Sequence, residues 1–236
     1  MSIFNYLLSG WLAPVKGWFG EQKISVVLRF LGNDYMLRND VLLVQGNYST
    51  QIDHVVVSRY GVFVIETKNY KGWIFGSETL YKWKHTTRSG SYEFYNPVLQ
   101  NKKHVAMLSR VLGRPVSIFV PIVVFTGVKK LRVNVSSHVV TTLGLNSVIS
   151  SYTTPILTDQ EVADICAKLD VQNKVSPALR QTHKMNARRV SQQKKALVAN
   201  GICPLCGGNL VRRKGRFGDF IGCDNYPHCR YTDKLP

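Results

Sequence analysis

The 236-residue sequence has few acidic side chains: 14 Asp and Glu stand against 31 Lys and Arg, a formal net charge of +17. Solubility alone does not require such a one-sided charge, which instead favours a polyanionic partner, either nucleic acid or an acidic membrane surface. The excess is uneven. Residues 1–170 carry 18 basic and 11 acidic side chains, whereas residues 171–236 carry 13 basic and 3 acidic ones. The C-terminal part is therefore expected to be the main contact for a polyanion.

The sequence also lacks a long apolar run. A membrane-spanning helix needs about 20 apolar residues, and the N-terminal segment is interrupted by Pro14 and Lys16. This segment has no basic region before its apolar part and no clear cleavage site, so it is a poor secretory signal, and we expect a cytoplasmic protein. Residues 1–19 have bulky side chains at helical spacing, which leaves two interpretations open: a helix packed on the core, or an amphipathic helix that holds the protein at the membrane surface.

Two common catalytic signatures are missing. There is no nucleophile-elbow motif for a Ser/His/Asp hydrolase, and the 18 glycines form no phosphate-binding loop followed by Lys and Ser or Thr. Cys166 has no His or Asp partner in a recognisable pattern and falls on an apolar helix face, so we expect it in the core. Catalysis, if present, must use other groups.

The order of apolar patterns predicts an α/β fold with a mixed sheet. A helix is expected over residues 20–32, and a better-marked one over 96–113, with Asn96 as N-cap, Pro97 at the first position and Gly113 as the stop. Strands are expected at residues 35–44, 53–58, 62–68, 72–76, 80–85, 116–126 and 138–142, and a further helix at 158–169.

The segment from Thr50 to Gly76, "TQIDHVVVSRYGVFVIETKNYKGWIFG", predicts a hairpin whose apolar stripe ends in charged residues. If the turn has two or four residues, the residue numbers of each cross-strand pair add up to 119, so Asp53 faces Glu66. A turn of three residues would shift the register, and the two acids would not face each other. Lys68 lies on the same face by alternation. Two opposed carboxylates repel and raise each other's pKa unless a cation lies between them.

A divalent cation, Mg²⁺ or Mn²⁺, would resolve this repulsion, because carboxylate oxygens are ligands that Mg²⁺ prefers. Asp53 and Glu66 are therefore the expected metal ligands of a catalytic site that hydrolyses phosphodiester bonds. Lys68 would position the attacking water or stabilise the pentacovalent phosphate. The plainer alternative is a Glu–Lys surface pair at a strand end.

The Asp, the interval of about a dozen residues and the Glu-Thr-Lys triplet resemble the D…(D/E)-x-K motif of the PD-(D/E)XK nuclease superfamily. More narrowly, Gly20-Glu21, residues 51–76 and "NPVLQNKKHV" resemble the nuclease-related domain, NERD, over about residues 15–130. The resemblance implies a restriction-endonuclease-like αβββαβ core. It also implies that Glu21 supports the metal site and that Gln100 reaches the same cleft. Taken alone, Glu21 suits the first turn of a helix and Gln100 a solvated helix face.

Four of the five cysteines lie in the last 34 residues, as C-x2-C, sixteen residues, and C-x5-C. This spacing predicts a closed tetrahedral structural Zn²⁺ site. The expected ligands are Cys203, Cys206, Cys223 and Cys229. So short a module has no adequate apolar core, so metal binding would supply most of its folding free energy.

Residues 203–231 also resemble the C-terminal zinc ribbons of type IA topoisomerases, which implies binding of single-stranded DNA. Basic and aromatic side chains of this module offer phosphate contacts and surfaces for base stacking. The expected DNA-binding residues are Arg212, Arg213, Lys214, Arg216, Phe217, Phe220 and Tyr226. The alternative is a ribbon that contacts another protein.

We thus predict four segments: an N-terminal apolar segment (1–19), a NERD-like nuclease domain (20–170), a basic linker (171–200) and a zinc ribbon (201–236). The linker has seven Lys or Arg and no acid or aromatic residue, and is expected to be disordered or partly helical. The resulting hypothesis is a metal-dependent deoxyribonuclease whose ribbon holds DNA. Its rivals are a non-catalytic nucleic-acid-binding protein and a scaffold at the membrane surface.

Overall fold

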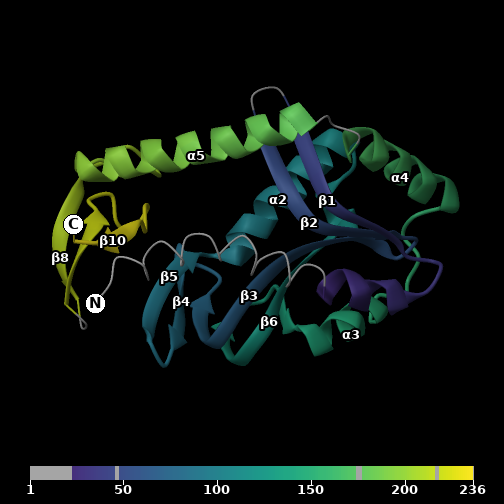
Figure 1. Ribbon diagram of the computed structural model, residues 1–236, viewed down its shortest axis with the longest axis horizontal. Coiled ribbons are helices and arrows are strands. Elements are labelled where there is room, and N and C mark those ends of the chain that lie inside the picture. The colour runs from purple at the N-terminus through teal and green to yellow at the C-terminus, as the bar shows by residue number, and fades with distance from the viewer. Residues whose placement is uncertain (1–22, 46–47, 174–176, 216–217, 236) are drawn as a thin grey trace. The chain divides into compact units, whose positions relative to one another are not determined.

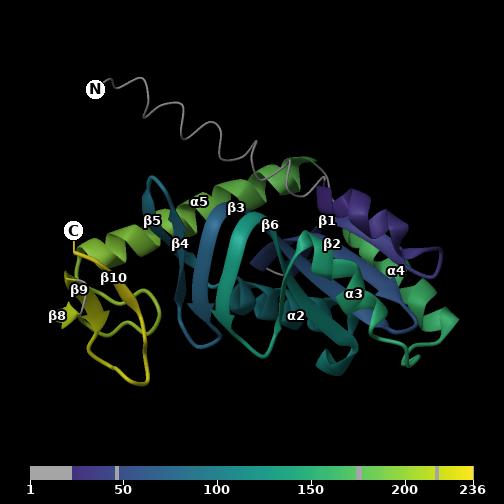
Figure 2. The same cartoon turned by 90° about the horizontal axis from the view of Figure 1, so that it is seen from below.

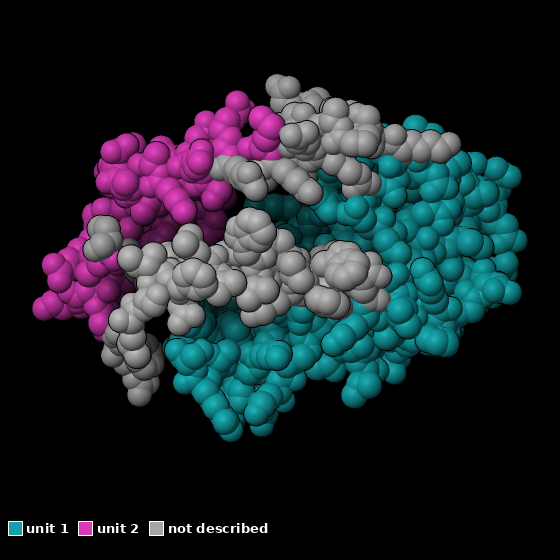
Figure 3. Space-filling view, viewed as in Figure 1, with its two compact units in different colours: residues 1–78, 82–175 teal, residues 79–81, 176–236 magenta. Residues whose placement is uncertain are grey.

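The computed structural model describes residues 23–45, 48–173, 177–215 and 218–235. The chain forms two compact units, residues 1–78 with 82–175 and residues 79–81 with 176–236 (Figure 3). The N-terminal segment 1–19, for which a helix was predicted, lies outside the described residues. In the described part of the chain, no helix combines the length and the apolarity that crossing a bilayer would require.

The first unit is a mixed sheet with helices on both faces (Figures 1 and 2). Helical residues 23–28 precede the 3₁₀ turn η1 (Arg29–Leu31). The strands are β1 (Met36–Gln45), β2 (Tyr48–Ser58), β3 (Gly61–Ser77), β4 (Lys82–Thr87), β5 (Gly90–Tyr95), β6 (Phe119–Asn134) and β7 (His138–Thr141). The other helical elements are α2 (Pro97–Leu112), η2 (Val116–Ile118), η3 (Thr142–Gly144), α3 (Leu145–Ser150) and α4 (Asp159–Asn173). The predicted α/β class is confirmed, including the helix, strand, helix, strand order of a restriction-endonuclease-like core.

The sheet is antiparallel from β1 to β5, and β6 then returns parallel to β3 with β7 parallel beside it. A parallel pair needs a long crossover connection, and α2 forms part of the one between β3 and β6. This topology makes β3 the strand against which β2, β4 and β6 all pair. Glu66 and Lys68 lie on this central strand, and Asp53 lies on its neighbour β2.

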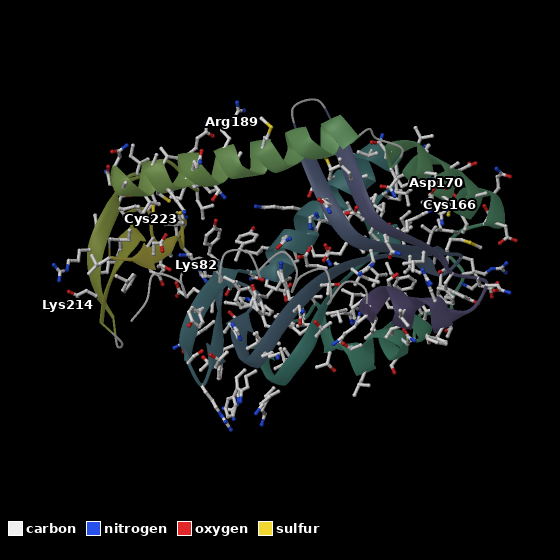
Figure 4. The ribbon with its side chains drawn as sticks, viewed as in Figure 1. Lys82, Cys166, Asp170, Arg189, Lys214 and Cys223 are labelled. Atoms are coloured by element: carbon white, nitrogen blue, oxygen red, sulfur yellow. The ribbon has the colours of Figure 1, made fainter. Side chains whose placement is uncertain are left out.

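Alternation along β3 divides the core into two layers. Val62 and Val64 lie in a cluster with apolar residues of α2 and α4, whereas Phe63 and Ile65 lie in a second cluster with residues of α3 and of the helical segment 23–28. Cys166 of α4 is buried in the first cluster, as predicted, and lies on the same helix as Asp170 (Figure 4).

The predicted ends of α2 are confirmed. The side chain of Asn96 accepts hydrogen bonds from the backbone N–H groups of Val98 and Leu99, and Pro97 occupies the first turn. Gly113 follows the helix with φ 65°, the left-handed conformation that glycine adopts without a steric penalty. These two caps fix where α2 starts and stops, and so which of its side chains face the sheet.

In the first unit, three strands are longer than predicted and one was not predicted. Strand β2 begins at Tyr48, before the predicted start at residue 53. The runs predicted at 62–68 and 72–76 form a single strand, β3, with a register irregularity at Gly72, whose φ is 100°. Strand β6 continues to Asn134, beyond the predicted end at residue 126, and β5 had no predicted counterpart. In these outer parts one face of the sheet is exposed, so polar residues interrupt the apolar signal.

The second unit contains α5 (Pro177–Ala199) and a three-stranded antiparallel sheet of β8 (Leu210–Gly215), β9 (Gly218–Cys223) and β10 (Thr232–Lys234), in the order β10-β9-β8. Helix α5 takes up most of the segment predicted as a linker that is disordered or partly helical. Strands β8 and β9 form an antiparallel pair whose paired residues run from Leu210–Cys223 to Gly215–Gly218.

Candidate functional site

The register predicted for the β2–β3 hairpin is confirmed from the turn as far as the pair His54 and Ile65. Val57 pairs with Val62, and Val55 pairs with Val64, so the two residue numbers of each pair add up to 119 as predicted. The ladder ends one step before Asp53 and Glu66, which are therefore not paired through their backbones. Two directly opposed carboxylates would repel each other. Instead, each of the two acids accepts hydrogen bonds from a separate set of donors.

Glu66 is a buried acid surrounded by three side-chain donors. It is 3% exposed. Its Oε1 atom accepts hydrogen bonds from Gln100 Nε2 at 2.9 Å and lies 2.6 Å from Lys68 Nζ, while its Oε2 atom lies 3.1 Å from His104 Nε2. Lys68 Nζ also donates to Gln100 Oε1 at 3.0 Å. Glu66, Lys68 and Gln100 thus form a closed triangle.

The charges in this cluster stabilise each other. Burial raises the pKa of Glu66, but the hydrogen bond from His104 and the charge of Lys68 outweigh it and lower that pKa overall. Burial lowers the pKa of Lys68, but the negative charge and hydrogen bond of Glu66, with a contribution from Asp53, raise it overall. The mutual raising of carboxylate pKa values was expected only where no cation lies close, and at Glu66 the neighbouring His104 and Lys68 lower the pKa instead.

Asp53 lies on the same hairpin, where the two strands separate. Its Oδ2 atom accepts a hydrogen bond from the backbone N–H of Thr67 at 2.7 Å. Because Thr67 stands between Glu66 and Lys68 in the sequence, this bond brings the Asp53 carboxylate to the segment that carries the other two charged residues. His54 points to the opposite face, where its Nδ1 atom lies 2.7 Å from Asn39 Oδ1, so it is not part of the cluster.

His104 belongs to the cluster and was not predicted. Its Nε2–H donates to Glu66, since a carboxylate can only accept, and its Nδ1 lies 2.9 Å from the hydroxyl of Thr50. The sequence did contain a signal. His104 follows Gln100 by four residues on a helix, and residues at that spacing lie on one face.

Asn101, next to Gln100, connects the two parallel strands. Its Nδ2 atom donates to the backbone carbonyl of Val64 on β3 at 2.8 Å and to that of Ile122 on β6 at 3.0 Å. The side chain is fully buried. This clamp fixes α2 over the sheet at the level where Gln100 reaches Glu66.

The structure therefore brings together Glu66, Lys68 and Gln100, with Asp53 held at the adjoining segment. Glu21 lies outside the described residues. In the described ranges, the only group of three or more His, Cys, Asp or Glu ligand atoms close enough to share a metal ion is the set of four cysteines. Asp53 and Glu66 are the two acids at this end of the hairpin, and each accepts hydrogen bonds there.

The four predicted zinc ligands converge. The Sγ atoms of Cys203, Cys206, Cys223 and Cys229 all lie within 4.8 Å of one another. Their thiols are not joined in disulfides, and Cys223 sits at the end of β9 (Figure 4). Hydrogen bonds from the Gly208 backbone and from Asn225 lower the pKa of Cys206 to about 6, which favours the thiolate that binds metal. Four sulfur atoms at such distances fit a tetrahedral Zn²⁺.

The predicted DNA-binding residues divide between exposed and engaged side chains. Arg212 is exposed and forms an ion pair with Asp219 at 2.6 Å. Arg213 donates to the carbonyl of Cys223 and lies over the ring of Tyr226, 5.9 Å from its centroid.

Lys214 is exposed and projects outward from β8 (Figure 4). Phe220 is partly buried, with its ring against Gly215 and Gly222, where an added Cβ atom would lie 3.1 and 3.3 Å from it. Arg216 and Phe217 lie outside the described residues.

Residues 16–126 match the family model of the nuclease-related domain. An uncharacterized protein of Bacillus anthracis is 36% identical over 179 residues, which is 69% of this chain and 84% of that protein. The chain belongs to the nuclease-related domain family. None of the solved structures matches it.

Residues 200–236 match the family model of the topoisomerase DNA binding C4 zinc finger. DNA topoisomerase 1 of Campylobacter jejuni is 45% identical over 47 residues, and that of Methanocaldococcus jannaschii is 64% identical over 34 residues. These segments are 20% and 14% of this chain but only 7% and 4% of the topoisomerases. The likeness therefore concerns the ribbon alone.

Proposed function

We propose that this nuclease-related domain protein is a metal-dependent nuclease that hydrolyses phosphodiester bonds in DNA. The observation that carries the proposal is the convergence of Glu66, Lys68 and Gln100 in one hydrogen-bonded group, with Asp53 anchored to the backbone between Glu66 and Lys68. Paired acids beside a fixed amine are what metal-assisted attack of water on a phosphate requires.

Asp53 and Glu66 would hold the catalytic Mg²⁺ or Mn²⁺, which would supply a polarised water and neutralise charge on the phosphate. The donor set suits a hard cation. Both oxygens of Glu66 already accept hydrogen bonds from three donors in all, so a cation would compete with these donors. Lys68 is the group suited to withdraw, because its ammonium is carried on a flexible four-carbon stem.

Lys68, once withdrawn from Glu66, would act as a cation beside the scissile phosphate. Its raised pKa keeps it protonated at neutral pH, so its role is electrostatic rather than that of a general base. Gln100, which contacts both Lys68 and Glu66, would hold the two in place. His104 would orient Glu66 from the other side as a positioning residue.

The test is cleavage of labelled single- and double-stranded DNA by the full chain with added Mg²⁺ or Mn²⁺. Asp53→Asn, Glu66→Gln and Lys68→Met are expected to lower the rate by about 100-fold or more, while DNA binding without added Mg²⁺ or Mn²⁺ is kept. Lys102→Met is the matched control, because Lys102 lies on α2 but pairs with the remote Glu78. Cleavage that persists in all three site variants, prepared in parallel, would refute the site.

A non-catalytic nucleic-acid-binding protein is the second candidate, and one observation favours it. Glu66 is nearly inaccessible, and Gln100, Lys68 and His104 occupy both of its oxygens, as in a structural ion pair. This reading predicts that the wild-type chain binds DNA and does not cut it with either metal. The same assay therefore decides between the two.

The ribbon is proposed to hold single-stranded DNA through Arg212, Lys214 and Tyr226, which are all exposed. This extends to the chain what the name of the matching topoisomerase zinc finger states. Its four thiolates would bind Zn²⁺, which presupposes a reducing compartment such as the cytoplasm. Lys214→Ala should weaken binding and reduce the salt dependence of log K by about 0.7, the effect of one phosphate contact on a single strand.

A further inference from the structure

One face of strand β3 is buried in its first half and exposed near its C-terminal end. Trp73 and Phe75 alternate with buried Ile74 and so lie on the face that carries Phe63 and Ile65 earlier in the strand. Strand β3 has 17 residues and spans about 56 Å, whereas α3, packed on this face, has six residues and is about 9 Å long. The indole of Trp73 is accordingly 41% exposed.

Basic residues flank these two rings on the neighbouring strands. Trp73 pairs with Lys130 of β6, and Phe75 pairs with Arg132 of β6 and with Lys84 of β4. Directly paired residues lie on the same face of a sheet, and all three basic side chains are exposed. We call these five residues the aromatic–cation face.

The aromatic rings and one cation are already stacked. The guanidinium carbon of Arg132 lies 5.0 Å from the centroid of the Trp73 ring and 6.0 Å from that of Phe75. The two ring centroids are 6.3 Å apart and tilted by 35°. Arg132 is thus held over flat apolar surface by cation–π contacts, so the face combines platforms and charge before any ligand arrives.

The charge on this part of the sheet is predominantly positive. Glu93 of β5 pairs with Lys84 in the ladder, and its carboxylate lies 3.8 Å from the ammonium group of Lys82. On this face, among the described residues of β4, β5 and the outer part of β6, the basic residues Lys82, Lys84, Lys130 and Arg132 stand against one acid, Glu93. A polyanion complements such a surface, while an apolar partner would leave the cations desolvated.

We infer that the aromatic–cation face binds single-stranded nucleic acid. Unpaired bases present flat faces that stack on aromatic side chains, whereas the bases of a duplex are stacked on one another and are inaccessible. Lys84, Lys130 and Arg132 would contact the phosphates, and Trp73 and Phe75 would take the bases. This inference adds a second surface to the nucleic-acid binding proposed above, and it requires neither cleavage nor the ribbon.

The first test measures affinity by fluorescence anisotropy of labelled single-stranded DNA and RNA oligonucleotides, with the full chain and no added Mg²⁺ or Mn²⁺. Trp73→Ala is expected to weaken binding about tenfold, the loss of one stacked base. Arg132→Ala should reduce the salt slope by about 0.7. The control for Trp73→Ala is Tyr92→Ala, which also removes an exposed aromatic ring. Tyr92 pairs with His85, and His85 pairs with Ile74, so Tyr92 lies on the face opposite to Trp73. Equal affinities of the two variants would overturn the inference.

The second test uses the unmodified chain, so it does not depend on the folding of a variant. Acetylation of lysines is followed by mass spectrometry with and without the oligonucleotide. Protection of Lys84 and Lys130, with Lys168 of α4 unchanged, supports the inference. If only Lys214 of the ribbon is protected, the ribbon is the sole binding surface and the inference is wrong.

A third arm replaces the oligonucleotide with vesicles of acidic phospholipid. Protection of Lys84 and Lys130 by vesicles but not by oligonucleotide would assign the face to a membrane and overturn the inference. Because none of these measurements needs catalysis, a failure of the proposed nuclease activity leaves their outcome unchanged. Conversely, a chain that cuts DNA without protecting Lys84 and Lys130 would retain the proposed activity and lose this surface.

Discussion

At the scale of single residues, the most constrained group is the carboxylate of Glu66. It receives a cation, an amide and an imidazole while almost wholly buried. A buried charge is tolerated when it is paired and hydrogen-bonded, so each donor contributes to stability as well as to any activity. The two contributions are separable only by comparing variants for both.

His104→Ala should destabilise the first unit by about 2–3 kcal/mol. The substitution leaves the Thr50 hydroxyl and one oxygen of Glu66 without this partner in a buried site, and unsatisfied buried polar groups each cost about 1–3 kcal/mol. Urea unfolding measures the change. His104→Gln keeps a donor and should lose less. Equal midpoints for wild type and His104→Ala would show that the imidazole contributes nothing.

His54 makes stability depend on pH between about 4 and 6.5. Burial lowers its pKa to about 4, and its Nε2 atom has no hydrogen-bond partner in the structure. The unfolded chain therefore binds the proton first as pH falls. The stabilisation is complete above pH 6.5 and is lost progressively down to pH 4, by about 3 kcal/mol.

Urea unfolding at a series of pH values tests this, and His54→Gln should flatten the profile in that window. His85→Gln, on the partly exposed part of β4, should leave the slope intact. Glu66 affects stability only at lower pH. Because its pKa is lowered in the folded state, its contribution to the free energy of unfolding is lost only below the unfolded pKa of about 4.3. An unchanged slope in His54→Gln would contradict the prediction.

Register arithmetic placed Glu66 and Lys68 on one face correctly because the period of a strand is fixed. It did not place His104. The spacing of four from Gln100 puts the two residues on one face of α2, but only the packing of α2 on the sheet brings that face to Glu66. Nor did it foresee that the ladder ends at His54 and Ile65, beyond which the Asp53 side chain accepts a hydrogen bond from the Thr67 backbone.

At the scale of elements, α2 determines the geometry of the site. It places Gln100 and His104 over Glu66, and its caps set the register of its face. The strong capping signals explain why its ends were predictable. Strand β5, with the sequence "GSYEFY", carried no such signal, because it is short and its side chains are largely exposed.

Gly113→Ala should lower the stability of the first unit by about 1 kcal/mol. Gly113 has φ 65°, and no atom lies within 4 Å of an added Cβ, so the effect is backbone strain rather than a clash. Gly113→Asn should lose less, because Asn tolerates this conformation. Thermal unfolding compares the two, and an Asn variant less stable than the Ala variant would contradict this account.

At the scale of the whole molecule, the chain comprises two units of different physical character. The first unit has an extensive buried core across seven described strands. The second unit has a small buried cluster that consists mainly of cysteine side chains. The spacing of the cysteines was sufficient to predict that the four thiols converge, because a tetrahedral site needs little else. The course of α5 was less predictable, since its sequence is polar throughout most of its length.

Removal of zinc should unfold the ribbon and leave the first unit intact. We expect one Zn²⁺ per chain, and a chelator or Cys223→Ser should expose residues 201–236 to limited proteolysis while the near-UV signal of buried Trp83 is retained. The reason is that metal binding supplies about 10 kcal/mol or more of folding free energy in such modules. A ribbon that stays resistant to protease without metal would contradict the prediction.

The adjacency of Gln100 and Asn101 restricts how the buried acid becomes reachable. Asn101 ties α2 to the backbones of β3 and β6, so a sliding or lifting helix would break both ties at once. We therefore expect access to Glu66 to come from rotamer changes of Lys68, Gln100 or His104 rather than from a shift of α2. Because the side chains of Lys68 and His104 are largely buried, such changes should be slower than the picosecond-to-nanosecond flips of exposed residues, and they would set the rate at which an ion is admitted.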